Sequence, residues 1–247
     1  MSESDTALAA RLAEAAGALL LDLRTSGRYD GKALGKAGDE AANAMLMREL
    51  AAARPDDAIL SEEEKDSAAR LSASRVWIVD PLDGTREYGE GRSDWAVHVA
   101  LAVDGVARVG AVALPGLGQT LTSGDPLPLR PANDPLKMLV SRTRPAAEAV
   151  FVAAALGAEL LPMGSAGAKA MAVVLGQADI YLHTGGQYEW DNCAPAAVAA
   201  AAGLHVSRVD GAPLRYNQAD TYLPDLLICR KELADKALRL ASEYRPA

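Results

Sequence analysis

The sequence predicts a layered, mixed α/β protein, and three observations lead to this fold class. The chain has 247 residues, of which 50% are hydrophobic, so it can bury a substantial core as one unit or two joined lobes. Apolar residues recur at helical spacing in some segments and form short β-branched runs in others. Strand and helix patterns alternate in the second half and cluster in the first, which is typical of layered α/β architectures.

The first elements are expected to be helical. Leu8, Leu12 and Leu19 recur on one face, which predicts an amphipathic helix. In order, we expect this helix over residues 4–24, a polar, glycine-rich loop or mobile lid over 26–38, and a second helix over 39–53.

Strand patterns follow these helices. A short strand is expected at 58–60, and a stronger one, β-branched and aromatic, at 76–79. Residues 95–103 and 106–114 form a predicted hairpin across Asp104-Gly105, a strong turn signal.

A segment rich in Gly and Pro, 115–134, is the expected boundary between lobes. This places an N-terminal α+β lobe over residues 1–125 and a C-terminal α/β lobe over 126–247. In the second lobe we expect strands at 138–140, 179–182 and 226–228, and helices over 145–156, 165–175, 189–202 and 232–244.

Composition narrows the classes of function. The net charge of −8 disfavours binding to nucleic-acid polymers, although a divalent metal can invert the charge of an acidic pocket. The apolar runs are too short and mild to span a membrane, and the segment after Met1 lacks the pattern of a secretory signal, so we expect a cytoplasmic protein. Cys193 and Cys229 lack CxxC spacing and are expected to be reduced and buried.

Carboxylates gather around the end of the strong strand. Asp80 and Asp83 flank Pro81, which should end the strand's hydrogen bonds, while Gly84 permits a tight backbone and Thr85 begins a short helix. Carboxylate oxygens suit Mg²⁺, and the following N–H groups suit a phosphate. A simple capped turn is an equally good interpretation of these six residues alone.

Two further acidic sites strengthen the metal interpretation. Glu62 and Glu63 follow the short strand, and Asp191 lies at the start of a predicted helix. Taken singly, the glutamates indicate an exposed acidic loop and Asp191 a favourable interaction with the helix dipole. Each of these signals is weak alone, but their joint occurrence in one recognisable order is not.

At this point the sequence resembles a family. Residues 77–85 resemble the first signature of the inositol monophosphatase superfamily, and Trp190-Asp191 with Ala194 resembles the second. The resemblance implies the layered α-β-α-β-α sandwich of the inositol monophosphatase and fructose-1,6-bisphosphatase type. Segments similar to the CysQ branch of 3′(2′),5′-bisphosphate nucleotidases, in an actinobacterial-looking pattern, are 60–63, 86–88, 164–169 and 214–217.

The same resemblance implies a site with two or three Mg²⁺ ions. The implied metal ligands are Glu62, Asp80, the carbonyl of Leu82, Asp83 and Asp191, with Glu63 at a weaker third ion. The implied catalytic residues, with Thr85 orienting the attacking water, are Asp39, Thr85 and Glu62. The implied substrate contacts are Asp83, Gly84, Thr85, Ser165, Lys169, Arg215 and Asp191.

Some of these residues have simpler interpretations. Ser165 is equally well placed to cap a helix, and Arg215 could instead only shape a sheet edge. Lys36 stands where the family often has Thr, and we expect it to be solvated. The histidines lack zinc-ligand spacing, so structural or surface roles are expected for His98, His183 and His205.

The implied activity is removal of the 3′-phosphate of adenosine 3′,5′-bisphosphate, and of its sulfated analogue, in sulfate assimilation. Thr184 stands where inositol-specific members usually carry Glu, which weakens the inositol interpretation. Alternatives are an inositol-1-phosphate or fructose-1,6-bisphosphate phosphatase of the same fold, or a non-catalytic binding protein. The resemblance further implies inhibition by Li⁺, a small phosphorylated nucleotide as partner, no membrane partner, and a homodimer.

Overall fold

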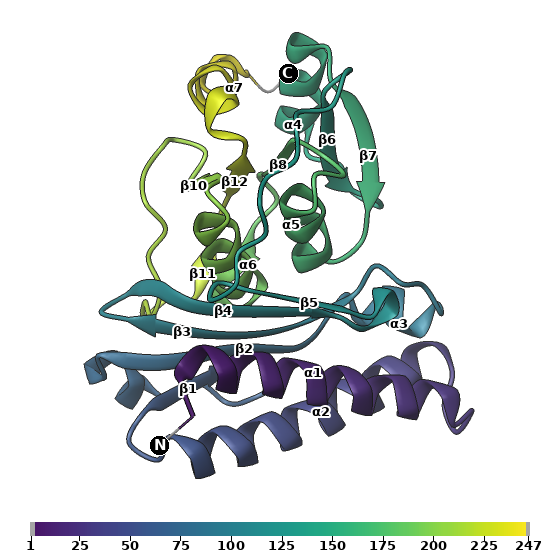
Figure 1. Ribbon diagram of the computed structural model, residues 1–247, viewed down its shortest axis with the longest axis vertical. Helices are drawn as coiled ribbons and strands as arrows, with labels where there is room; N and C mark the ends of the chain where they lie inside the picture. The colour runs from purple at the N-terminus through teal and green to yellow at the C-terminus, as the bar shows by residue number, and fades with distance from the viewer. Residues whose placement is uncertain (1–2, 246–247) are drawn as a thin grey trace.

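The computed structural model describes residues 3–245, and it is built from five layers (Figure 1). Met1 and Ser2, part of the stretch considered for a secretory signal, lie outside the described residues. A pair of helices, a five-stranded sheet, a second pair of helices, another five-stranded sheet and a last pair of helices follow one another in space. The predicted α-β-α-β-α sandwich is therefore confirmed.

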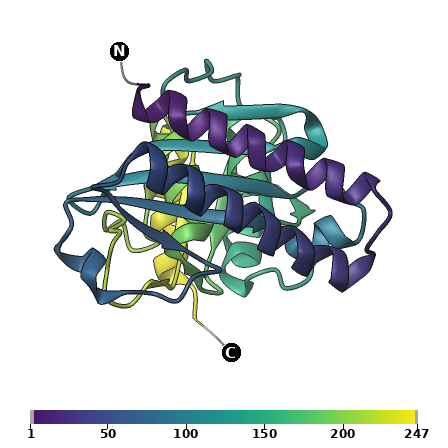
Figure 2. The ribbon, with the colours of Figure 1, turned by 90° about the horizontal axis from the view of Figure 1, so that it is seen from below.

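The first layer consists of α1 (Asp5–Thr25) and α2 (Gly31–Ala53), which cross one face of the first sheet side by side (Figure 2). Ser4 caps α1 by accepting the Ala7 N–H at 3.2 Å. Leucines at helical spacing on α1, among them Leu8, Leu12 and Leu20, are fully buried against the sheet.

The first sheet has the order β1-β2-β3-β4-β5. Its strands are β1 (Ala58–Ser61), β2 (Arg75–Asp83), β3 (Ala96–Val103), β4 (Val106–Leu114) and β5 (Gln119–Thr122). β1 runs parallel to β2, and the other pairs are antiparallel. Because β1 and β2 are parallel, the residues that follow them emerge at the same edge of the sheet. The short helix α3 (Thr85–Gly89) follows β2 directly.

The second sheet has the order β10-β12-β8-β6-β7. Its strands are β6 (Lys137–Ser141), β7 (Glu159–Met163), β8 (Ile180–His183), β10 (His205–Ser207) and β12 (Leu226–Cys229). Helices α5 (Ala166–Val174) and α6 (Glu189–Ala201) lie between the two sheets, and α4 (Ala147–Leu156) and α7 (Lys231–Glu243) cover the far face. A two-stranded ribbon joins β9 (Gln187–Tyr188) to β11 (Tyr222–Leu223).

The hydrophobic core follows the layers. One cluster joins α1 and α2 to the first sheet, one surrounds α5 and α6, and one joins the second sheet to α4 and α7. Small residues let α6 approach the first sheet, because a Cβ at Gly110 would lie 2.8 Å from that of Ala197. Cys193 and Cys229 are free and buried, as predicted. No helix in the described part of the chain is long and apolar enough to cross a membrane.

The loop or mobile lid predicted over 26–38 is wrong. α2 begins at Gly31, eight residues earlier than predicted, and only a short turn precedes it. Its glycines serve close packing: a Cβ at Gly35 would lie 2.7 Å from the Thr85 methyl group, and one at Gly38 would lie 3.0 Å from Leu82. The glycines that suggested a flexible loop are thus contact points of a helix.

The predicted end of the strong strand at Asp80 is also wrong. β2 continues to Asp83, with a register shift between Asp80 and Asp83 that takes up the interruption by Pro81. The segment 115–134 contains β5, so it is not a pure linker, and β7, β9, β10 and β11 are strands that the sequence did not indicate. The division into lobes at 125/126 stays a prediction.

Candidate metal centre and active site

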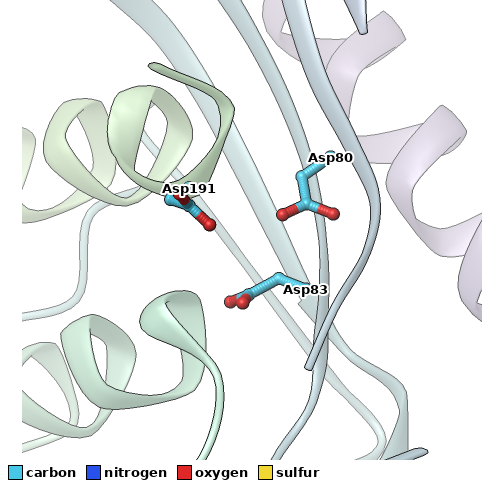
Figure 3. Close-up of side chains that lie close together, drawn as sticks. All are labelled: Asp80, Asp83 and Asp191. Atoms are coloured by element: carbon cyan, nitrogen blue, oxygen red, sulfur yellow. The ribbon is translucent and has the colours of Figure 1, made fainter. Parts of the chain in front are cut away.

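Three carboxylates from two distant parts of the chain converge where the first sheet meets the middle helices. Asp80 and Asp83 project from the end of β2, and Asp191 projects toward them from the first turn of α6 (Figure 3). One carboxylate oxygen from each of the three lies within 4.8 Å of the other two. Hard divalent cations prefer such oxygen ligands, and we call these three residues the acidic triad.

The register shift in β2 positions the first two members of the triad. Asp80 is directly opposite His98 on β3, whereas Asp83 is opposite Ala96, so the two strands advance unequally between these pairs. Asp80 is only 1% exposed, and its Oδ1 accepts the Leu82 N–H at 3.0 Å. The bulge therefore lets two residues three apart present their carboxylates to one point.

Asp83 is held by the N-terminus of α5. Its oxygens accept hydrogen bonds from the Ser165 hydroxyl, the Ala166 N–H at 3.1 Å and the Gly167 N–H at 2.6 Å. Backbone N–H groups at a helix N-terminus favour a negative charge. Although burial acts in the opposite direction, contacts with His98, Ser165 and Gly167 lower the pKa of Asp83 to about 2.

His98 connects two parts of the triad. Its Nδ1 lies 3.0 Å from the Trp190 carbonyl oxygen, and its Nε2 lies 3.3 Å from Asp83 Oδ2. Because a carbonyl only accepts, we assign the proton on Nδ1. Burial alone would lower the pKa of His98, but Asp83 and the Trp190 carbonyl outweigh it and raise the pKa, which favours an imidazolium facing the carboxylate.

Asp191 is fixed by its own helix. Its Oδ2 accepts the Tyr188 N–H at 2.6 Å, which closes the first turn of α6. Burial and the charge of Asp83 raise the pKa of Asp191 to about 6. Burial, followed by the charges of Glu62 and Asp83, raises the pKa of Asp80 well above its usual value. Like charges held this close are unfavourable without a cation, so the donor set fits a divalent metal.

The two predicted glutamate ligands lie beside the triad without joining its tightest group. Glu62 extends the pairing of β1 with β2, since its N–H donates to the Val79 carbonyl at 3.4 Å. Desolvation of its carboxyl and the charge of Asp191 raise the pKa of Glu62 to about 7. Glu63 is exposed. The parallel pair thus brings these acids to the predicted sheet edge, but their role as ligands stays a prediction.

A cleft of about 880 Å³ opens on the α2–α3 side of the site, lined among others by Asp39, Glu63 and Thr85. The Asp39 side chain is mostly buried, and its Oδ1 has no hydrogen-bond partner among the described residues. Burial and the charges of Glu63 and Glu62 raise the pKa of Asp39 to about 7. Lys36 also lines the cleft, but its side chain is 79% exposed and 3.7 Å from Glu40, which agrees with the solvated interpretation.

The predicted substrate contacts occupy different surroundings. Gly84 has φ of +89°, and a Cβ there would lie 3.1 Å from that of Ser165, so the position requires glycine. The Thr85 hydroxyl donates to the Leu82 carbonyl at 3.0 Å. Ser165 caps α5 by accepting the Ala168 N–H at 3.0 Å, which favours the capping interpretation.

Lys169 and Arg215 differ in how they relate to the site. Lys169 is buried, and its Nζ donates to the Ser165 carbonyl at 2.6 Å and lies 5.3 Å from the centre of the Tyr181 ring. Burial lowers the pKa of Lys169, while the charge of Asp83 opposes this shift. Arg215 is exposed before β11, and none of the contacts found in residues 3–245 joins it to the triad. Its substrate role rests on the resemblance alone.

A buried carboxylate that the sequence did not indicate secures the start of α6. Glu189 is fully buried, and its oxygens accept the N–H groups of Asn217 and Gln218 at 2.6 and 2.7 Å. Arg70 connects the turn at Asn217 to the loop after β1. Its guanidinium donates to the Asn217 side chain and pairs with Asp66 in that loop at 2.7 Å. These contacts join the glutamate-bearing loop after β1 to the helix that carries Asp191.

His98 and Gly167 are the site residues that reasoning from the sequence missed. His98 is buried, so the surface interpretation is wrong, and its structural interpretation omits its contact with Asp83. A Cβ at Gly167 would lie 2.9 Å from His98 Cε1 and closer still to Nε2, so glycine makes room for the ring. The useful signal is the alternation of strand β3, which places His98 on the same sheet face as the opposing Asp80.

Comparison with known proteins agrees with this geometry. The model of the inositol monophosphatase family matches residues 1–245. The chain belongs to this family. CysQ from Bacteroides thetaiotaomicron, a bacterial member of this family with a crystal structure, is 26% identical to this chain. The two structures superpose with a TM-score of 0.79, covering 91% of this chain and 96% of that one.

Two mycobacterial proteins are more similar to this chain in sequence. A 3′-phosphoadenosine 5′-phosphate phosphatase of Mycobacterium leprae is 49% identical, covering 97% of this chain and 94% of that protein. The protein of the same name from Mycobacterium tuberculosis is 53% identical, covering 89% of this chain and 86% of that one. The predicted actinobacterial, CysQ-like pattern is therefore confirmed.

Proposed function

We propose that this chain is a Mg²⁺-dependent phosphomonoesterase that removes the 3′-phosphate of adenosine 3′,5′-bisphosphate and leaves AMP. The observation that carries the chemistry is the acidic triad, whose three carboxylates come from both halves of the fold and lie within 4.8 Å of one another. The choice of substrate is supported by two mycobacterial phosphatases of that specificity, which are 49% and 53% identical to the chain.

The triad and Glu62 would hold two or three Mg²⁺ ions, with Glu63 at the weakest position. When bound, such ions neutralise phosphate charge, lower the pKa of a bound water and stabilise the leaving oxygen. The all-oxygen donor set and the raised pKa values of Asp80 and Asp191 support this assignment.

The protein's own groups prepare the site for a phosphate ester. The N-termini of α5 and α6 both face the triad, so their positive ends favour an anion there. Asp39 lies in the cleft with a free Oδ1, so it can accept a proton from a water and act as a general base. Thr85 shares the cleft with Asp39, where its hydroxyl can orient a water.

The test is phosphate release, with Mg²⁺ and with EDTA, from adenosine 3′,5′-bisphosphate, inositol 1-phosphate and fructose 1,6-bisphosphate. We expect the nucleotide to give the highest kcat/KM and EDTA to abolish turnover. A higher kcat/KM for the inositol or fructose ester would reassign the substrate within the same fold. Hydrolysis of none of the three would favour a binding protein.

Asp83→Asn tests the role of the triad. The variant should lose turnover, because it removes a charge and turns an amide toward the N–H donors of Ala166 and Gly167. Asp104→Asn in the exposed hairpin turn is the matched control, since Asn tolerates its φ of 51°. Equal activity of both variants would remove Asp83 from the mechanism.

We place the enzyme in the cytoplasm, acting on a small nucleotide.

A further inference from the structure

Three aromatic side chains gather beside the metal centre, and the proposed mechanism uses none of them. Tyr188 stacks on Trp190 with ring centres 4.9 Å apart and planes 9° from parallel. Tyr222 meets Tyr188 edge-on at 5.9 Å. The chain has only eleven Phe, Trp and Tyr residues, so three in one place form a marked concentration. We call Tyr188, Trp190 and Tyr222 the aromatic cluster.

The cluster is open to solvent. Tyr188 and Tyr222 are each 46% exposed, and Trp190 is partly buried against the core. The other two tryptophans of the chain, Trp77 and Trp95, are fully buried. Burying an aromatic ring is favourable, because it removes a large apolar area from water. An exposed group of rings at the edge of an active site therefore offers a surface for a flat apolar partner.

The cluster is also fixed to the triad. Tyr188 pairs with Tyr222 across the β9–β11 ribbon, and its N–H donates to Asp191 Oδ2 at 2.6 Å. A Cβ at Gly186 would lie 2.7 Å from Cζ of Tyr222, so glycine there leaves room for this ring. Trp190 is the residue before Asp191, and its carbonyl binds His98. The rings and the metal ligands therefore keep a set geometry.

We propose that the aromatic cluster stacks the heterocyclic base of the nucleotide while its 3′-phosphate lies at the acidic triad. This inference rests on the proposed function and deepens it by assigning the base subsite. A base has a π face that an inositol or a sugar phosphate lacks, so the cluster favours nucleotides. Stacking also suits an acidic chain of net charge −8, since it needs no cation in the subsite.

The direct experiment measures binding of AMP, the expected product, in the presence of Mg²⁺. Quenching of Trp190 fluorescence reports the binding, with ribose 5-phosphate as the probe that lacks a base and Trp190→Phe as the check on the signal. Removing a ring on which a base stacks raises the Kd by about 5- to 150-fold. We expect Tyr222→Leu to weaken AMP by a factor in this range and ribose 5-phosphate far less.

Two further variants sharpen the comparison. Tyr222→Phe keeps the ring and should bind AMP nearly as the wild type does. Tyr244→Leu is the matched control, because Tyr244 pairs with Phe151 at 5.8 Å on the outermost layer, away from the triad. Thermal unfolding of each variant shows whether the fold is retained.

The outcomes separate the inference from the proposed function. If the wild type hydrolyses adenosine 3′,5′-bisphosphate but Tyr222→Leu binds AMP as tightly as the wild type, the base subsite is wrong and the function stands. Equal losses for AMP and ribose 5-phosphate would also overturn the base subsite, since the change would be general. Failure of the wild type to hydrolyse any nucleotide would refute the proposed function itself.

Discussion

Replacing Gly167 by alanine should damage the metal centre through a side chain that is not itself a predicted ligand. The added Cβ would lie 2.9 Å from Cε1 and 3.0 Å from Cδ2 of His98. The ring cannot move freely, because it is completely buried and its Nδ1 binds the Trp190 carbonyl. Either His98 leaves Asp83 or the start of α5, whose Gly167 N–H binds Asp83 at 2.6 Å, must shift.

Two magnitudes follow. Overpacking of this kind costs about 1–3 kcal/mol, which lowers the Tm of a chain of this length by roughly 2–12 °C. Loss of a group that orients a metal ligand lowers metal affinity or activity by about 10- to 100-fold. We therefore expect Gly167→Ala to lose both stability and Mg²⁺ affinity, measured by thermal unfolding and by calorimetric titration of Mg²⁺ into the metal-free protein.

A matched control separates the two effects. Gly17→Ala adds the same methyl group on α1, where its Cβ would lie 2.6 Å from Cγ of Pro115 in another layer. It should lower Tm similarly without changing Mg²⁺ affinity. Adding His98→Ala to Gly167→Ala should restore part of the stability but not the affinity. Wild-type Mg²⁺ affinity in Gly167→Ala would refute the role given to His98.

Two other predictions concern stability. In the folded protein the pKa values of Asp39 and Glu62 are raised to about 7, above their ordinary values near 4. Folding therefore favours the protonated carboxyls, so their contribution to the free energy of unfolding is complete at pH 4 and is lost as the pH rises through 7. In EDTA, Tm should therefore fall between pH 5 and 8. The rise in Tm caused by Mg²⁺ should be larger at pH 8 than at pH 5. A Tm in EDTA that rises over this range would contradict these pKa shifts. Glu189→Gln should lower the free energy of unfolding by about 1–3 kcal/mol, because one amide oxygen cannot replace the two carboxylate oxygens that accept the N–H groups of Asn217 and Gln218. An unchanged urea unfolding curve would show that the turn at Asn217 and Gln218 does not depend on Glu189.

The parts of the site that depend on residues close together in the chain could be predicted from the sequence. The apolar patterns before Glu62 and Asp80 indicated two strands, and the parallel pairing of these strands explains why both sets of acids reach one edge of the sheet. The periodicity of α1 and the turn at Asp104-Gly105 depend on nearby residues, so the first helix and the hairpin were predictable.

Features that depend on distant contacts were not predictable in this way. The glycines of α2 resemble a loop until Thr85 and Leu82 pack against them, because helix propensity ignores the partner. The bulge at Pro81 needs strand β3 to define its register. His98 acquires its role only when α6 brings the Trp190 carbonyl to it, across 92 positions of the chain.

The capping of α5 by Asp83 has a consequence for the order in which the protein folds and takes up metal. The helix N-terminus carries a partial positive charge, equivalent to about half an elementary charge, and it already balances the carboxylate through the Ala166 and Gly167 N–H groups. Small zinc domains, by contrast, gain their folding energy from the ion. Assembly of this site need not wait for the cation, so a divalent metal can be loaded and released repeatedly without unfolding, as its local supply rises and falls.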